Sequence, residues 1–182
     1  MTALDLRYPI GRYAPPTAFS ATWRAAQIAR IATTPSALRA AVAGLSDEQL
    51  DTPYRPDGWT VRQVVHHLPD SHLNAYVRLK LALTEDRPTI RPYDEVAWAQ
   101  LEDSRSTPIE VSLQLLDAVH DRFVRLLRSM NDADFDRRYV HPDSGEHTLH
   151  HLLGLYAWHG DHHVAHVTAL RARMQWEWAA HP

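Results

Sequence analysis

The chain has 182 residues, of which 45% are hydrophobic and 23% are charged, a composition typical of soluble globular proteins rather than disordered ones. Its net charge of -3, without a Lys/Arg cluster, argues against a nucleic-acid partner, and no apolar run approaches the roughly 18 residues that span a membrane. There is no cysteine, which excludes disulfides, thiol nucleophiles and thiolate metal ligands. We therefore expect a single domain over residues 1–182, located in the cytoplasm.

The elements expected along the chain are helical. Residues 1–16 contain three prolines and a glycine, and we expect them to form an extended arm that lies over another part of the protein. Helices are then expected over residues 17–32, 35–44 (opened by Pro35), 60–83, 107–130 and 148–176, with irregular connections between them. Because indications of strands are almost absent, the prediction is an all-α protein, an antiparallel four-helix bundle with an extended N-terminal arm.

Several helix starts carry recognisable caps. Thr60 with Gln63 has the spacing of a capping box, and Ser46 with Gln49 has the same spacing around a short turn. Thr107 is expected to cap the third long helix, with a proline as its first residue. Thr148 is expected to begin the last helix.

Histidine is unusually frequent, with 13 residues, and three pairs are spaced four residues apart where random placement would give about one. The facing of each side chain must therefore be considered as well. At 100° per residue, the apolar side chains of the last helix lie within about 40° of one line, and His163 and His159 lie about 20° and 60° from it. His166 lies near the border of this stripe and His162 points outward, which makes His159 and His163 the candidates for the bundle interior.

The helix that begins at Thr60 offers a further histidine. His67 lies at the edge of its apolar stripe and can turn inward, His66 lies opposite the stripe, and His72 lies within it as a rival. We expect the histidines at positions 66, 120, 141, 147, 150, 151, 162 and 181 on the surface or in loops. One inward histidine is usually a hydrogen-bonded core residue, whereas two inward histidines one turn apart gain little from each other unless a cation accepts their lone pairs. Spacing and facing leave both interpretations open.

Two segments, GWTVRQVVHHL and LYAWHGDHHVAHVTAL, resemble the DinB/YfiT-like superfamily of metal-binding four-helix bundles. YPIGRY in the arm, RPYDEVAW in the loop and HPD before the last helix extend the resemblance, which looks closest to the YfiT branch of metal-dependent hydrolases. The resemblance implies a metal site with three histidine ligands, which fall here on His67, His159 and His163, in agreement with the helical-face argument. It also implies a homodimer.

Three imidazoles would leave at least one coordination position of a divalent cation open, as in catalytic zinc sites. We expect one divalent ion per subunit, Zn or Ni first, although histidine nitrogens also suit Cu and Fe. The prediction is a metal-dependent hydrolase that activates water against a small-molecule substrate. The first alternative is an S-transferase, as in some relatives, which conjugates a low-molecular-weight thiol such as bacillithiol to electrophiles. The second is a metal-binding bundle without turnover.

Side chains beside the three histidines are harder to assign. There is no HExxH motif, and Asp161 points away from the apolar stripe. In the RPYDEVAW loop, Asp94 and Glu95 are candidates for an acid that reaches the metal, and Arg91 for a group that binds an anionic substrate. His166 is the candidate to support a ligating histidine. Trp158 lies opposite the apolar stripe of its helix and is expected to face the arm or a partner subunit; Trp176 and Trp178 could also serve an interface.

Overall fold

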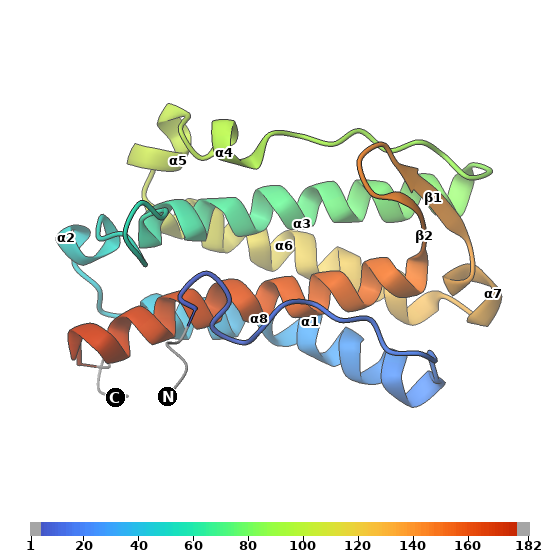
Figure 1. The fold of residues 1–182 in the computed structure, drawn as a ribbon, viewed down its shortest axis with the longest axis horizontal. Coiled ribbons are helices and arrows are strands. Elements are labelled where there is room, and N and C mark those ends of the chain that lie inside the picture. Colours follow the sequence, from blue (N-terminus) through green and yellow to red (C-terminus); the bar gives the residue numbers. More distant parts are fainter. Residues whose placement is uncertain (1–4, 178–182) are drawn as a thin grey trace.

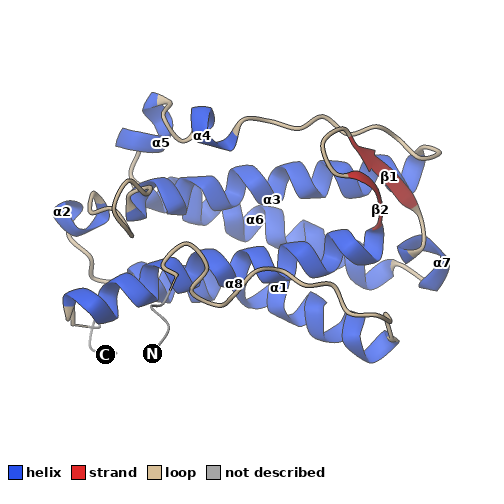
Figure 2. Ribbon diagram, in the orientation of Figure 1, coloured by secondary structure: helices blue, strands red, loops and turns tan. Residues whose placement is uncertain are grey.

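Four long helices dominate the computed structural model, which describes residues 5–177 (Figures 1 and 2). In chain order the elements are α1 (Ala21–Val42), α2 (Asp47–Leu50), α3 (Val61–Thr84), α4 (Glu95–Trp98), α5 (Glu102–Ser106), α6 (Ile109–Ser129), α7 (Asp132–Phe135), β1 (Arg138–His141), β2 (Gly145–Thr148) and α8 (Leu149–Met174). The pair α1 and α8 runs in one direction, and the pair α3 and α6 runs in the opposite direction (Figure 1). The predicted four-helix bundle is confirmed, with antiparallel packing between two pairs whose own members are parallel.

The parallel order of α3 and α6 requires a long crossover. Residues 85–108 leave the end of α3 and return along the bundle to the start of α6, and they carry the short helices α4 and α5 (Figure 1). Both short helices contact α3. The crossover therefore covers a face of α3 that would otherwise be open to solvent.

The N-terminal arm lies along α8, as predicted for its described part, residues 5–16 (Figure 1). The backbone carbonyl of Gly11 accepts a hydrogen bond from Trp158 Nε1 at 3.2 Å, which confirms that Trp158 faces the arm. Tyr13 packs against His151, which precedes Trp158 on α8 by about two turns. Arm residues 1–4, together with Trp178 and His181, lie outside the described residues.

Several predicted boundaries were wrong. The two helical stretches on either side of Pro35 form one continuous α1, which begins after the N-cap Ser20 rather than at Thr17. Thr107 does not cap α6, because no side-chain cap is present there and its carbonyl instead contacts His66. The segment between α6 and α8, predicted to be irregular, contains α7 and an antiparallel hairpin in which Arg138 pairs with Thr148.

Other caps were predicted correctly. Thr60 accepts from the Gln63 backbone and Gln63 reaches back to the Thr60 backbone, so the capping box holds the start of α3. Thr148 caps α8 by accepting from the backbone N–H of His151.

None of the helices described within residues 5–177 combines the length and the hydropathy that a membrane-spanning helix requires.

The hydrophobic core is divided into two clusters by a polar layer halfway along the bundle. One cluster contains Ile31, Ala75, Phe123 and Ala157. The other contains Leu38, Leu68, Leu116 and Val167, which lie on the same four helices nearer the end of the bundle where α3 and α6 begin. The intervening turns carry histidines on α3, α6 and α8. The candidate site lies in this layer.

Candidate metal centre

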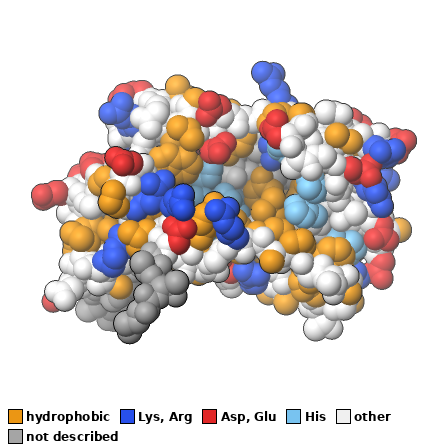
Figure 3. Space-filling model, viewed as in Figure 1, with side chains coloured by type: hydrophobic (Ala, Val, Ile, Leu, Met, Phe, Trp, Pro, Cys, Tyr) orange, Lys and Arg blue, Asp and Glu red, His pale blue; other side chains and the backbone are white. Residues whose placement is uncertain are grey.

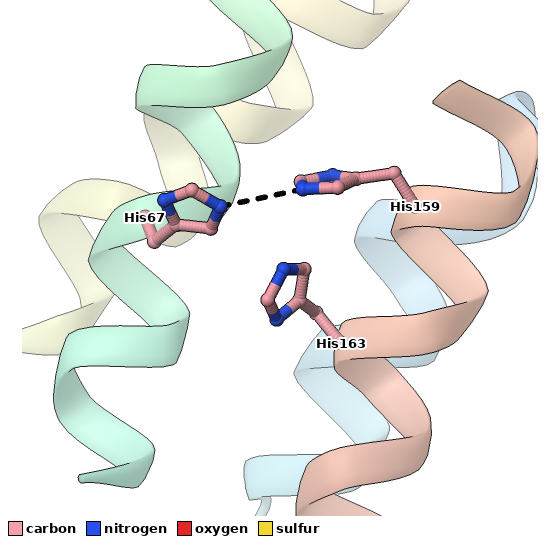
Figure 4. Close-up of side chains that lie close together, drawn as sticks. All are labelled: His67, His159 and His163. Atoms are coloured by element: carbon pink, nitrogen blue, oxygen red, sulfur yellow. Dashed lines mark hydrogen bonds between the residues drawn. The ribbon is translucent and has the colours of Figure 1, made fainter. Parts of the chain in front are cut away.

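Three histidine rings converge between α3 and α8 (Figure 4). His67 comes from α3, and His159 and His163 lie one turn apart on α8; one nitrogen from each ring lies within 4.8 Å of the other two. The Nε2 atoms of His67 and His159 are 3.3 Å apart. The structure therefore brings together the three residues predicted from the sequence.

Burial keeps these imidazoles neutral. Loss of water, followed by the nearby His162 and His166, lowers the pKa of His67 to about 4. Desolvation is also the main cause that lowers the pKa of His159 and His163. Neutral imidazoles retain a lone pair on one nitrogen, which is the form that binds a cation. The donor set fits a divalent transition metal, because three neutral nitrogens, with no fourth ligand grouped with them among residues 5–177, leave an open position.

His166 supports the ring of His163 from the side of the arm. Its Nε2 lies 3.1 Å from the Arg7 carbonyl, and its Nδ1 lies 3.4 Å from His163 Nδ1. Since a carbonyl can only accept, His166 donates through Nε2 and accepts at Nδ1 from His163. His163 is then left with an unprotonated Nε2, and Figure 4 shows this ring nitrogen pointing toward the other two rings.

A cavity of about 560 Å³ opens beside the three rings. Histidine side chains lie at the bottom of a hollow on this face of the molecule, with cationic and apolar side chains around it (Figure 3). The aromatic lining includes Trp59, Tyr54, Tyr93 and Tyr156, and the charged lining includes Arg7, Arg78, Glu95 and Asp143. The cavity is large enough for a small molecule and gives it access to the open side of the site.

Comparison with known proteins fits this geometry. The DinB superfamily matches residues 30–167. The chain belongs to this superfamily. It is 51% identical over 177 residues to YfiT of Bacillus subtilis (strain 168), covering 97% of this chain and 99% of YfiT, a protein whose name assigns it provisionally to the metal-dependent hydrolases. A protein of Bacillus mycoides (strain KBAB4) with a similar name is 51% identical over 172 residues, covering 94% of this chain and 99% of its own length.

The fold is shared as well. The solved structure of Bacillus subtilis YfiT, described as having an unusual four-helix bundle topology, matches this DinB-superfamily chain with a TM-score of 0.92. The sequence identity is 50%, and the match covers 94% of this chain and 99% of that one. The two parallel pairs, of which α3 and α6 are joined by a long crossover, are consistent with that description.

The loop residues singled out in the sequence have different positions in this DinB-superfamily chain. Glu95 lines the cavity. Asp94 instead caps α4 by accepting from the Ala97 backbone N–H at 2.8 Å. Arg91 is exposed and is not among the residues that line the cavity; its backbone carbonyl accepts a hydrogen bond from Arg78 at 3.2 Å. Asp161 points away from the site, as predicted, and pairs with Arg30.

The prediction that the remaining histidines lie on the surface or in loops was wrong for four of them. His66, His120, His150 and His162 are all at most 7% exposed. His162 is covered by Tyr8 of the arm and by Trp158 of α8, whose rings lie 5.7 and 4.4 Å from its ring. His66 is covered by the start of α6 and contacts Ser112 Oγ at 2.7 Å.

Two buried histidines at the site were not assigned a role from sequence. His72, considered only as a rival ligand, contacts His159 Nδ1 through its Nε2 at 3.2 Å. His120 contacts the other nitrogen of His72 from α6. Facing pointed to His72, which lies within the apolar stripe of α3, but no pattern in the sequence indicated that His120 joins it.

Proposed function

We propose that His67, His159 and His163 hold one divalent cation per chain, Zn²⁺ or Ni²⁺, and that the protein is a metal-dependent hydrolase of small molecules. The observation that carries the proposal is the convergence of three neutral imidazoles at the wall of an open cavity. The names of the Bacillus relatives support the same reaction class. When bound, a divalent cation at this position supplies Lewis acidity, which can activate water for hydrolysis or a small thiol for transfer.

The cavity wall suggests roles for its charged groups. We propose that the Glu95 carboxylate is the general base that accepts a proton from the attacking nucleophile, because Glu95 lines the cavity from the crossover. Arg78, which donates to Tyr156 Oη at 3.3 Å, and Arg7 of the arm provide positive charge for an anionic part of the substrate. Glu95→Gln should reduce turnover while metal content stays unchanged.

A thiol S-transferase is the second candidate, and one observation favours it. Among residues 5–177, no carboxylate hydrogen-bonds to any of the three rings. The reaction would then depend more on the cation than on a neighbouring base. The protein itself has no cysteine that could compete with a small thiol such as bacillithiol for the cation.

We also propose that the protein is a homodimer. Helix α4, the residue before α5 and the start of α6 carry exposed apolar side chains, among them Val96, Leu101 and Val111, each at least 55% exposed. Such side chains are suited to a protein interface. Light scattering coupled to size exclusion would measure the mass, and a monomer at micromolar concentration would contradict this part of the proposal.

Metal analysis of purified protein tests the site directly. We expect about one equivalent in the wild type and loss of metal in His67→Ala, with the fold retained. His66→Ala is the matched control, because His66 is equally buried on the same helix but contacts Ser112 and Thr107 instead. Full metal occupancy in His67→Ala would overturn the ligand assignment.

Activity assays then separate the candidates. The metal-loaded and EDTA-treated proteins should be compared on a panel of small esters and amides, and on conjugation of small thiols to monochlorobimane. Metal-dependent hydrolysis supports the first proposal, and metal-dependent conjugation supports the transferase. Full metal occupancy with neither reaction would favour a bundle that binds metal without turnover.

A further inference from the structure

A line of three imidazoles connects His159 to the opposite side of the bundle. His159 Nδ1 lies 3.2 Å from His72 Nε2, and His72 Nδ1 lies 2.9 Å from His120 Nε2. His120 Nδ1 ends the line 2.7 Å from the backbone carbonyl oxygen of Ile31. His72 is fully buried and His120 is 2% exposed, so water does not compete for these contacts.

The carbonyl at the end of the line is available because of a proline. Pro35 lies inside α1 and has no N–H, so the carbonyl four residues earlier, that of Ile31, lacks its regular helical partner. A buried carbonyl without a partner is costly, by about 1–3 kcal/mol. The ring of His120, which reaches α1 from α6, fills this position.

The Ile31 carbonyl determines the donor and the acceptor of every hydrogen bond in the line. A carbonyl can only accept, so His120 carries its proton on Nδ1 and, as a neutral ring, accepts at Nε2. His72 must then donate through Nδ1 and accept at Nε2. His159 in turn donates through Nδ1, which leaves its Nε2 unprotonated on the side where it meets His67.

We propose that His72 and His120 are positioning residues: because the Ile31 carbonyl can only accept, the two hydrogen-bonded rings determine which nitrogen of His159 carries the proton. They hold His159 in the tautomer and ring orientation that present its Nε2 lone pair to the cation. This inference rests on the proposed metal site for its consequence, but its first measurement does not need a metal. The line takes one group from each long helix, so the ligand is oriented by the packing of the whole bundle.

The rings are also held against rotation. His72 and His120 each use both nitrogens, and their rings stack with centroids 4.7 Å apart. The ring of Tyr156 meets the edge of His72 at 5.2 Å. Hydrogen bonds from groups behind a ligating histidine fix its tautomer, and their loss typically weakens metal affinity by about 10–100-fold.

The first experiment is long-range ¹H–¹⁵N correlation spectroscopy of the metal-free protein labelled in its histidine rings, at pH 8. We expect His120, His72 and His159 all to carry their proton on Nδ1, which is the less common form of a free imidazole. A His159 protonated on Nε2 in the wild type would overturn the proposal. Because no metal is present, this result holds whether or not the proposed function is correct.

The second experiment compares Zn²⁺ affinity among variants. His72→Phe keeps the ring but removes both hydrogen bonds, and we expect its Kd to rise about 10–100-fold. His72→Gln can still donate and accept, and should recover most of the loss. His66→Phe, an equally buried ring outside the line, should stay close to the wild type.

The outcomes of the second experiment are distinct. Wild-type affinity in a folded His72→Phe would overturn the positioning role. If His72→Phe does not fold, His72→Gln decides, and a loss of affinity in it as large as that of His67→Ala would overturn the role. If the wild type itself binds no Zn²⁺, the proposed function fails. The tautomer of His159 in the metal-free protein then decides by itself whether His72 and His120 fix the position of its proton.

Discussion

Acid should destabilise the metal-free protein, and His120 allows the effect to be worked out for one group. Its burial lowers its pKa from 6.5 to about 4, against the opposing effects of the hydrogen bond to Ile31 and the charge of Asp117. Because the folded pKa lies below the unfolded one, the unfolded chain binds more protons between these values. The contribution of the neutral, buried His120 to the free energy of unfolding is therefore fully present above pH 6.5 and is lost as the pH falls toward 4. For one such group the loss between pH 7.5 and pH 5 is about 2 kcal/mol.

Denaturant unfolding of the wild type and His120→Phe at these two pH values measures the effect. At pH 7.5 the variant should be less stable, since the Ile31 carbonyl and His72 each lose a partner worth about 1–3 kcal/mol. At pH 5 this deficit should shrink by about 2 kcal/mol, because phenylalanine takes up no proton. Val124→Ala, one turn further along α6, is the matched control and should have the same deficit at both pH values. A His120→Phe deficit that stays constant within about 0.5 kcal/mol would refute the reasoning.

Three other changes probe the packing and the metal. Gly160→Ala should cost about 1–3 kcal/mol in a thermal melt, because an added Cβ would lie 2.6 Å from Thr34 Oγ1 where α8 meets α1; unchanged stability would mean that the two helices can move apart. His166→Phe should raise the Kd for Zn²⁺ about 10–100-fold in a chelator competition by removing the acceptor of His163, and a wild-type Kd would count against that contact. Zn²⁺ at 100 times its Kd should raise the free energy of unfolding by about 2.7 kcal/mol; the gain should disappear with EDTA, and the same gain in His67→Ala would contradict the site.

The helical periodicity was sufficient to predict the bundle and to select His159 and His163 as inward-facing candidates, but it did not select His67 by itself. His159 and His163 share a face with the apolar residues of α8, and that face must point inward for the helix to pack. His67 was a weaker prediction, because it lies at the edge of its stripe and only a small rotation of α3 brings it in. The match between this face analysis and the family resemblance made the assignment of His67 over His72 possible.

The same periodicity failed for histidines outside the stripes, because it treats the bundle interior as the only place to bury a side chain. His162 is buried by the arm, and His66 is buried by the start of α6 after the crossover has returned. Neither the course of the arm nor that of the crossover has a period that could be counted along the sequence. Pro35 was misjudged for a related reason: proline usually marks a helix start, but here the helix continues and the freed carbonyl is used by α6.

The hydrogen bonds of the polar layer also determine which ring nitrogens have a partner in the metal-free protein. The two hydrogen-bonded lines, one from the Ile31 carbonyl and one from the Arg7 carbonyl, satisfy their inner imidazoles at both nitrogens. Acceptors outnumber donors where the lines meet, since His159 and His163 both present an unprotonated Nε2 and His67 brings one ring nitrogen to the same point. A single ring proton can satisfy only one of these lone pairs, whereas a cation can accept all three. In the metal-free layer one of these lone pairs therefore has no donor among the three rings and faces the cavity, and a cation that binds there need not reorganise the surrounding rings.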